Sequence, residues 1–115
     1  MDNKKTIYIA HPIGGDVSNN IKKVLKICSE IHNETTIPVV PYLVCLQYLS
    51  DTDPASRSLG ISADLETFHR GYIDEVWIYG DHISAGMKKE IELALSLNIP
   101  VFAKTKETIE EFEKM

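Results

Sequence analysis

EVWIYGDHISAGMKKEIELALSL, residues 75–97, joins a β-rich run, a loop of small residues and an amphipathic run in direct succession. Residues 75–79 are mostly apolar and typical of a buried strand, and residues 80–83 form the turn after it. Ser84 is a favoured helix N-cap residue, so we expect a helix from there to Leu97. Strand, loop and helix in this order form the unit from which parallel α/β sheets are built.

The same alternation extends over the rest of the chain. Further strands are predicted at 6–10, 36–40 and 99–103, and helices from Asp16 or Ser18 to Ile31, at 61–70, and from Thr105 onward. Residues 42–60 give the weakest secondary-structure signal. A short helix is one interpretation of residues 42–49, and a polar turn follows at 50–54. We therefore predict one domain over residues 1–115, a Rossmann/flavodoxin-like three-layer sandwich with a mainly parallel sheet of four to five strands.

Composition narrows the classes of partner and the compartment. The net charge is -5 and no basic run is present, so we expect no long nucleic acid as a partner. No stretch approaches the roughly 20 apolar residues needed to span a bilayer, and residues 1–5 are polar, which indicates a cytoplasmic protein without a membrane partner. Cys28 and Cys45 lie in apolar stretches without CxxC spacing and are interpreted as buried, reduced thiols.

Two strand-to-helix junctions, residues 10–15 and 80–86, are rich in small residues. Both are expected at the carboxyl edge of the sheet, where parallel α/β folds bind their ligands. Glycines there let backbone N–H groups approach a ligand, so we expect the ligand to be an anion or a sugar with several hydroxyls. The simpler alternative is that the glycines only form tight turns. Neither GxGxxG nor GxxxxGK[ST] occurs.

Glu90 is the most informative carboxylate. It is not a capping-box partner of Ser84, because the third helical position is Met87. With Met87, Ile91, Ala94 and Leu95 predicted to form the buried stripe of the helix, Glu90 falls at the edge of that stripe. It is either a partly desolvated nucleophile or general base, or a solvated surface glutamate.

Other acidic side chains and the histidines complete the set of candidates. A second carboxylate for glycosidic chemistry could come from Asp64, Glu66 or Asp74. The histidines at 11, 69 and 82 lack metal-ligand spacing, so no metal site is expected.

Three segments resemble the nucleoside 2-deoxyribosyltransferase-like superfamily. Residues 7–15 resemble its first strand and sugar-binding loop, and residues 74–78 resemble the strand before its catalytic loop. Residues 84–94, followed by 99–101, resemble its Gly-x-x-x-Glu-x-x-x-Ala helix and final strand, which is the most specific match.

The resemblance implies roles for individual residues. Glu90 would attack the anomeric carbon and form a covalent glycosyl-enzyme, Tyr8 would position it, and Asp64 would be the acid, with Glu66 still in contention because the spacing to Asp74 is two residues longer than usual. The resemblance further implies a homo-oligomer, a dimer or higher, and no cofactor. The implied substrate-binding residues are His11, Pro12, Ile13, Gly14, Gly15, Ser84, Gly86 and Met87.

Departures from the family pattern bear on the substrate. True transferases tend to have aspartate where Ser84 stands, whereas a serine there resembles the deoxynucleoside monophosphate N-glycosidases and favours a nucleotide. The first-loop arginine of those hydrolases is missing from residues 11–15, and the C-terminal asparagine of the transferases is not evident in residues 107–115. We therefore expect N-glycosidic cleavage of a nucleoside 5'-monophosphate or related nucleotide. A non-catalytic module for a nucleotide or ADP-ribose-like ligand is the alternative, and deoxyribosyl transfer between bases is a weaker one.

Overall fold

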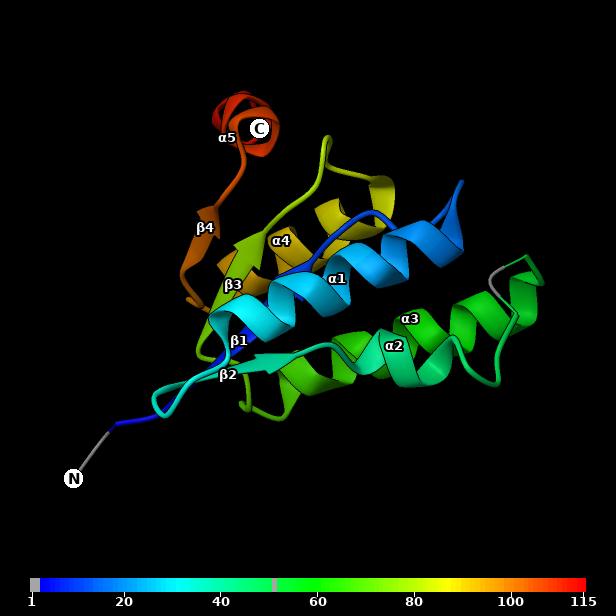
Figure 1. Cartoon of the computed structure of the whole chain (residues 1–115), viewed down its shortest axis with the longest axis horizontal. Helices are drawn as coiled ribbons and strands as arrows, with labels where there is room; N and C mark the ends of the chain where they lie inside the picture. The colour runs from blue at the N-terminus through cyan, green and yellow to red at the C-terminus, as the bar shows by residue number, and fades with distance from the viewer. Residues whose placement is uncertain (1–2, 51) are drawn as a thin grey trace.

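Four parallel strands form one sheet in the order β2-β1-β3-β4 (Figure 1). The computed structural model describes residues 3–50 and 52–115. In it β1 (Lys5–Ala10) pairs with β2 (Thr36–Val39) on one side and with β3 (Glu75–Ile78) on the other, and β4 (Val101–Ala103) pairs with β3. The chain is thus a single flavodoxin/Rossmann-like α/β domain, as predicted.

Helices cover both faces of the sheet. The helix α1 (Val17–Ile31) lies on one face, and α3 (Pro54–His69) and α4 (Ala85–Ser96) lie together on the other (Figure 1). This division follows from right-handed crossovers that leave the two central strands in opposite directions. The remaining helices are α2 (Pro41–Cys45), which packs on α3, and α5 (Lys106–Glu113), which packs on β4.

The central strand is completely buried where it meets α3 and α4. Tyr8 pairs in register with Val76, and both are fully buried. The Tyr8 ring packs on Phe68 with ring centroids 4.8 Å apart and on Tyr42 at 6.0 Å. This aromatic cluster holds β1, α2 and α3 together directly below the carboxyl ends of the strands.

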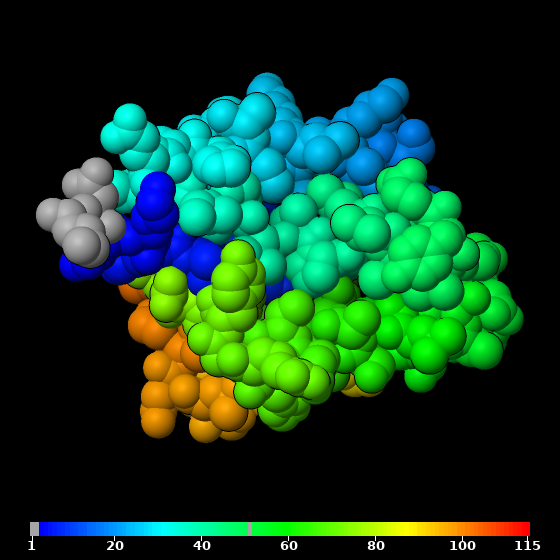
Figure 2. Space-filling model, turned by 90° about the horizontal axis from the view of Figure 1, so that it is seen from below, coloured from blue at the N-terminus to red at the C-terminus, as the bar shows by residue number. Residues whose placement is uncertain are grey.

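The prediction for the middle of the chain was wrong in its boundaries. The helix expected at 61–70 begins at Pro54, because the Asp53 side chain accepts a hydrogen bond from the Ser56 amide at 3.0 Å and proline suits the first helical position. Residues 42–60 are therefore mostly helical, in α2 and the first half of α3, which lie side by side across the face seen in Figure 2. The polar turn predicted at 50–54 includes Asp51, which lies outside the described residues.

One apolar side chain expected on the buried stripe of α4 is exposed. Leu95 is 51% exposed, because it lies at the outer margin of the helix's apolar face. Both cysteines are free thiols, but only Cys45 is buried and Cys28 is half-buried. Gly71, directly after the C-cap residue Arg70 of α3, has a φ of 71°, a left-handed conformation that glycine tolerates. In the described part of the chain, no helix combines the length and apolar character needed to cross a bilayer.

Candidate active site

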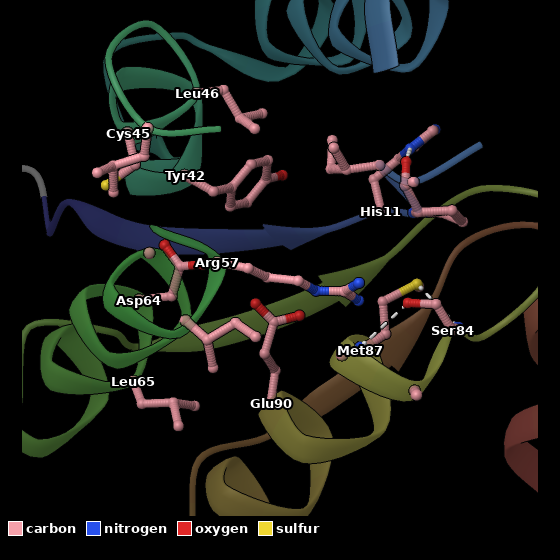
Figure 3. A pocket seen from close by; sticks show the side chains of 18 of the residues that line it. His11, Tyr42, Cys45, Leu46, Arg57, Asp64, Leu65, Ser84, Met87 and Glu90 are labelled. Atoms are coloured by element: carbon pink, nitrogen blue, oxygen red, sulfur yellow. Dashed lines mark hydrogen bonds between the residues drawn. The ribbon is translucent and has the colours of Figure 1, made fainter. Parts of the chain in front are cut away.

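A pocket opens at the carboxyl edge of the sheet, between the loop after β1 and the helices α2, α3 and α4 (Figure 3). Its volume is about 230 Å³. The loops after β1 and β3 meet beside it at Gly80, which has a φ of 104° and where an added Cβ would lie 2.5 Å from Cδ of Pro12. Only glycine permits this approach, so the two junctions predicted to share one edge are in direct contact.

Glu90 extends into the pocket from the second turn of α4 (Figure 3). Its carboxylate accepts a hydrogen bond from the Tyr8 hydroxyl, which rises from the buried face of β1. Tyr8 does not line the pocket and instead supports Glu90 from below. Of the two alternatives for Glu90, a solvated surface residue is therefore excluded by its position.

Asp64 enters the same pocket from α3 and is 8% exposed. Its Oδ1 is buried and has no hydrogen-bond partner within the described residues. A buried acceptor without a donor is costly, so this oxygen is suited to a donor on a ligand or to carrying a proton itself. Its nearest rivals lie elsewhere: Glu66 is exposed and pairs with Arg70 at 3.0 Å, and Asp74 accepts a hydrogen bond from the Thr6 amide at the start of β1.

The two pocket carboxyl groups are both shifted toward the protonated form. Burial raises the pKa of Asp64 to about 7 and the pKa of Glu90 to about 8. The Asp64 charge raises the pKa of Glu90 further, whereas the hydrogen bond from Tyr8 lowers it. At neutral pH the pair therefore holds at least one proton, so it can both donate and accept hydrogen bonds.

The first loop presents a neutral histidine to the same pocket. His11 Nδ1 lies 2.7 Å from the Pro12 carbonyl oxygen, so Nδ1 carries the proton and donates it to that carbonyl. Burial lowers the pKa of His11, which keeps the ring neutral near pH 7. The Asn20 side chain fixes the same loop by donating to the Ile13 carbonyl at 2.9 Å.

The second loop leads into α4 through a reciprocal cap. Ser84 Oγ accepts a hydrogen bond from the Met87 amide at 3.2 Å, and Met87 Sδ accepts one from the Ser84 amide at 3.4 Å. A thioether thus takes the place of the usual Glu or Gln, which leaves Glu90 free for the pocket, as its sequence position indicated.

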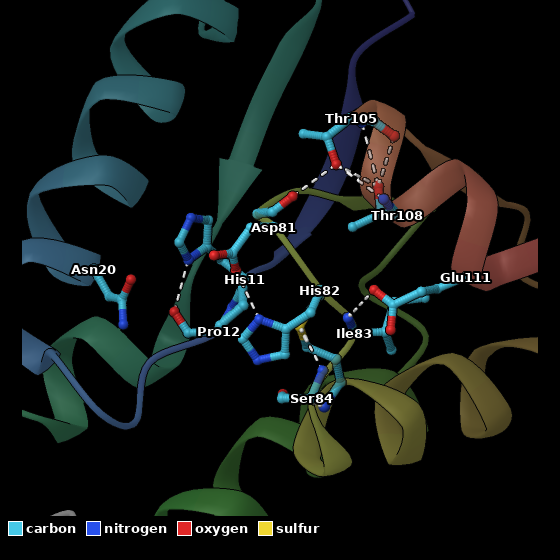
Figure 4. A network of polar contacts seen from close by, with 12 residues as sticks. His11, Pro12, Asn20, Asp81, His82, Ile83, Ser84, Thr105, Thr108 and Glu111 are labelled. Atoms are coloured by element: carbon cyan, nitrogen blue, oxygen red, sulfur yellow. Dashed lines mark hydrogen bonds and ion pairs between the residues drawn. The ribbon is translucent and has the colours of Figure 1, made fainter.

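The C-terminal helix holds this second loop from behind (Figure 4). The Ile83 amide donates to the Glu111 carboxylate at 3.0 Å, and the Thr105 hydroxyl donates to the Gly80 carbonyl at 2.7 Å. At the loop's outer side, His82 and Asp81 form an exposed pair at 2.7 Å.

Most residues predicted for the site come together. Glu90 and Asp64 line the pocket with His11, Pro12, Ile13, Gly14, Ser84, Gly86 and Met87, whereas Gly15 does not line it. Sequence reasoning missed Arg57 of α3 and the lining residues of α2 and the segment after it, which include Tyr42, Cys45, Leu46 and Leu49. The signal that could have located Arg57 is Asp53-Pro54, a helix-start pattern that places it in the second turn of α3.

The fold and the pocket together define the class of protein. It is a parallel α/β domain with a buried tyrosine and two carboxyl groups at the carboxyl edge of the sheet. No cluster of three or more potential metal ligands occurs among residues 3–50 and 52–115. The chain belongs to the family described as Domain of unknown function (DUF7768), whose model matches residues 5–104. No curated protein and no solved structure shows significant similarity to it.

Proposed function

We propose that this protein cleaves the N-glycosidic bond of a nucleoside 5'-monophosphate or a related nucleotide. The observation that carries the proposal is the cluster of Tyr8, Glu90 and Asp64 at the mouth of the central strands. A nucleophilic carboxylate supported by a phenol, with a second carboxyl group in the same pocket, is the equipment that glycosyl chemistry uses. The resemblance to the nucleoside 2-deoxyribosyltransferase-like superfamily at residues 7–15 and 84–94 points to the same substrates.

The first step forms a glycosyl ester on Glu90. A Glu90 oxygen attacks the anomeric carbon while the bond from that carbon to the base breaks, and the electron pair leaves with the base. Asp64 gives its proton to the departing base and becomes a carboxylate. In the second step Asp64 takes a proton from water and the water oxygen bonds to the anomeric carbon, while the bond from that carbon to the Glu90 oxygen breaks and its electron pair returns to the Glu90 carboxylate.

This mechanism requires opposite protonation states of the two carboxyl groups. In the protein alone burial raises the pKa of both carboxyl groups, whereas attack needs an ionised Glu90 and a protonated Asp64. Positive charge that develops on the sugar beside Glu90 favours its ionised form, and the Tyr8 hydrogen bond acts in the same direction.

The same raised pKa of Glu90 supports a second candidate, a module that binds a nucleotide or ADP-ribose-like ligand without turnover. A protonated Glu90 is a hydrogen-bond donor for a sugar oxygen, which suits binding as well as catalysis. Transfer of the glycosyl group to another base is the third, and it differs from hydrolysis only in what attacks the ester.

A panel of ribo- and deoxyribonucleoside 5'-monophosphates, with free base followed by chromatography, tests the proposal. Glu90→Gln is expected to reduce base release at least about a thousandfold, while the matched change at exposed Glu92 on the same helix leaves it unchanged. Release at the parent rate by Glu90→Gln contradicts the assignment. Ligands that raise the melting temperature without being cleaved support the binding module. Formation of a new nucleotide that contains an added free base supports transfer.

A further inference from the structure

The two ends of the pocket differ in charge. Its inner end holds Asp64 and Glu90, and neither forms an ion pair in the described part of the chain. Its rim carries Arg57 from α3 and the first turn of α4, whose free amides add positive partial charge. A ligand in this pocket therefore meets acceptors at one end and donors at the other.

Arg57 is directed across the pocket toward α4 (Figure 3). Its guanidinium makes no hydrogen bond or ion pair with the residues that the structure describes. The other arginine of this region, Arg70 at the C-terminal end of the same helix, pairs with Glu66 at 3.0 Å. Arg57 thus keeps its five donors free at the place where a ligand would lie.

The first turn of α4 faces the same space. Ser84 and Met87 cap each other, which leaves the amides of Ala85 and Gly86 without an acceptor among the described residues. Gly86 has no Cβ to cover the backbone there, and the nearest atom to an added Cβ is Ser84 Oγ at 4.0 Å. Free amides at the start of a helix, with a guanidinium across from them, form a set of donors that matches a phosphate.

An independent observation at the inner end also points to a ligand. Asp64 Oδ1 is buried without a donor although it borders the pocket. It calls for a hydroxyl, an N–H group or a proton at that end and disfavours an anion. A bound molecule that satisfies both ends carries its donors toward Asp64 and its negative charge toward the rim.

We propose that Arg57 of α3, together with the free amides of Ala85 and Gly86, holds the 5'-phosphate of the substrate. This inference rests on the proposed function for the identity of the rest of the ligand. The arginine missing from residues 11–15 is then supplied by another element, 42 or more positions further along the chain, and Arg57 determines the preference for nucleotides over nucleosides.

The assignment is tested with the variants Arg57→Ala and Arg57→Lys. Arg70→Ala is the matched control, because it removes one positive charge from the same helix. The kcat/KM for base release is measured on each monophosphate that the protein cleaves and on its nucleoside. Arg57→Ala is expected to lower the value for the monophosphate roughly 10- to 100-fold, mainly through KM, and to leave the nucleoside unchanged. Arg57→Lys recovers part of the loss, because it restores charge without the planar fork, and Arg70→Ala has no effect.

Calorimetric binding of the same ligand pairs separates this inference from the proposed function, since it needs no turnover. If no base is released but the monophosphate binds more tightly than the nucleoside and Arg57→Ala removes the difference, the glycosidase proposal fails and the phosphate site stands. If nucleoside and monophosphate are cleaved alike by the parent and by Arg57→Ala, the glycosidase stands and the Arg57 assignment is wrong. Equal losses on both substrates also overturn it.

Discussion

The Tyr8 hydroxyl on the central strand donates a hydrogen bond to the Glu90 carboxylate on α4, 82 residues further along the chain. Tyr8 is fully buried and is held by ring contacts with Tyr42 and Phe68, so its hydroxyl has a defined position. Burial and the charge on Glu90 raise the pKa of Tyr8 well above its usual value, which keeps it a donor at every working pH. The phenol thereby orients Glu90 and favours its ionised form.

Tyr8→Phe is expected to lower base release about 10- to 100-fold, because it removes a hydrogen bond to a charged group. The pKa of Glu90 rises when this bond is lost, so the acid limb of the pH-rate profile moves to higher pH. A profile recorded from pH 4 to 9 checks both effects. The control is Tyr79→Phe, because Tyr79 directly follows β3 and is half-buried. An unchanged acid limb in Tyr8→Phe contradicts the role assigned to Tyr8.

The raised pKa of Asp64 predicts how stability depends on pH. The folded protein keeps the Asp64 proton up to about pH 7, whereas the unfolded chain loses it near pH 4. The folded state therefore binds more protons between these values, and the free energy of unfolding falls as the pH rises through this window. Glu90, with a pKa raised to about 8, extends the fall to higher pH.

Asp64→Asn is expected to stabilise the protein at pH 8 relative to the parent, by roughly 2–4 kcal/mol, and to have little effect at pH 4. Urea unfolding at several pH values measures this difference. Glu66→Gln, an exposed carboxylate on the same helix, serves as control and should leave the pH dependence unchanged. An equally steep fall in Asp64→Asn and in the parent means that Asp64 is not a buried acid.

Gly80→Ala is expected to destabilise the protein by about 2–4 kcal/mol, because a φ of 104° is strained for alanine and its Cβ would lie 2.5 Å from Pro12. Gly71→Ala separates the two causes, since Gly71 has a φ of 71° and open space around an added Cβ. Its cost is expected to be about 1 kcal/mol. Equal melting temperatures for the two variants indicate that the two site loops do not touch.

Glu111→Ala is expected to cost about 1–3 kcal/mol of stability and to weaken base release, because the buried Ile83 amide loses its acceptor and the loop before Ser84 loosens. Glu111→Gln keeps an acceptor oxygen and is expected to retain most of both properties. The matched control is Glu110→Ala, which changes an exposed neighbour on the same helix. Thermal unfolding and the activity assay together check the effect, and parent-like values for Glu111→Ala contradict it.

The resemblance to the nucleoside 2-deoxyribosyltransferase-like superfamily predicts a dimer or larger homo-oligomer, in which subunits complete one another's sites. Light scattering coupled to size-exclusion chromatography at micromolar concentration measures the mass directly. A chain mass of 13.0 kDa makes monomer and dimer easy to distinguish. A monomer throughout the concentration range counts against a shared site.

Much of the architecture follows from the sequence by local rules. Short apolar runs such as residues 75–79 indicate strands, and Ser84 and Thr105 mark helix starts that the structure confirms. Glu90 was identifiable because Met87 occupies the capping position, so that no local partner explains the glutamate. These features depend on neighbours within a few residues, which is why spacing alone reveals them.

Only the tertiary structure decided which distant groups meet. Three features depend on how α3 and α4 pack against the sheet. They are the contact between Tyr8 and Glu90, the burial of Asp64 in the pocket while Glu66 stays exposed, and the entry of Arg57 into the pocket. Spacing along a helix assigns a side chain to a face, but the depth of its burial and the groups opposite it are set by the elements that cover that face. The pKa values of the site, and with them its chemistry, arise from that packing.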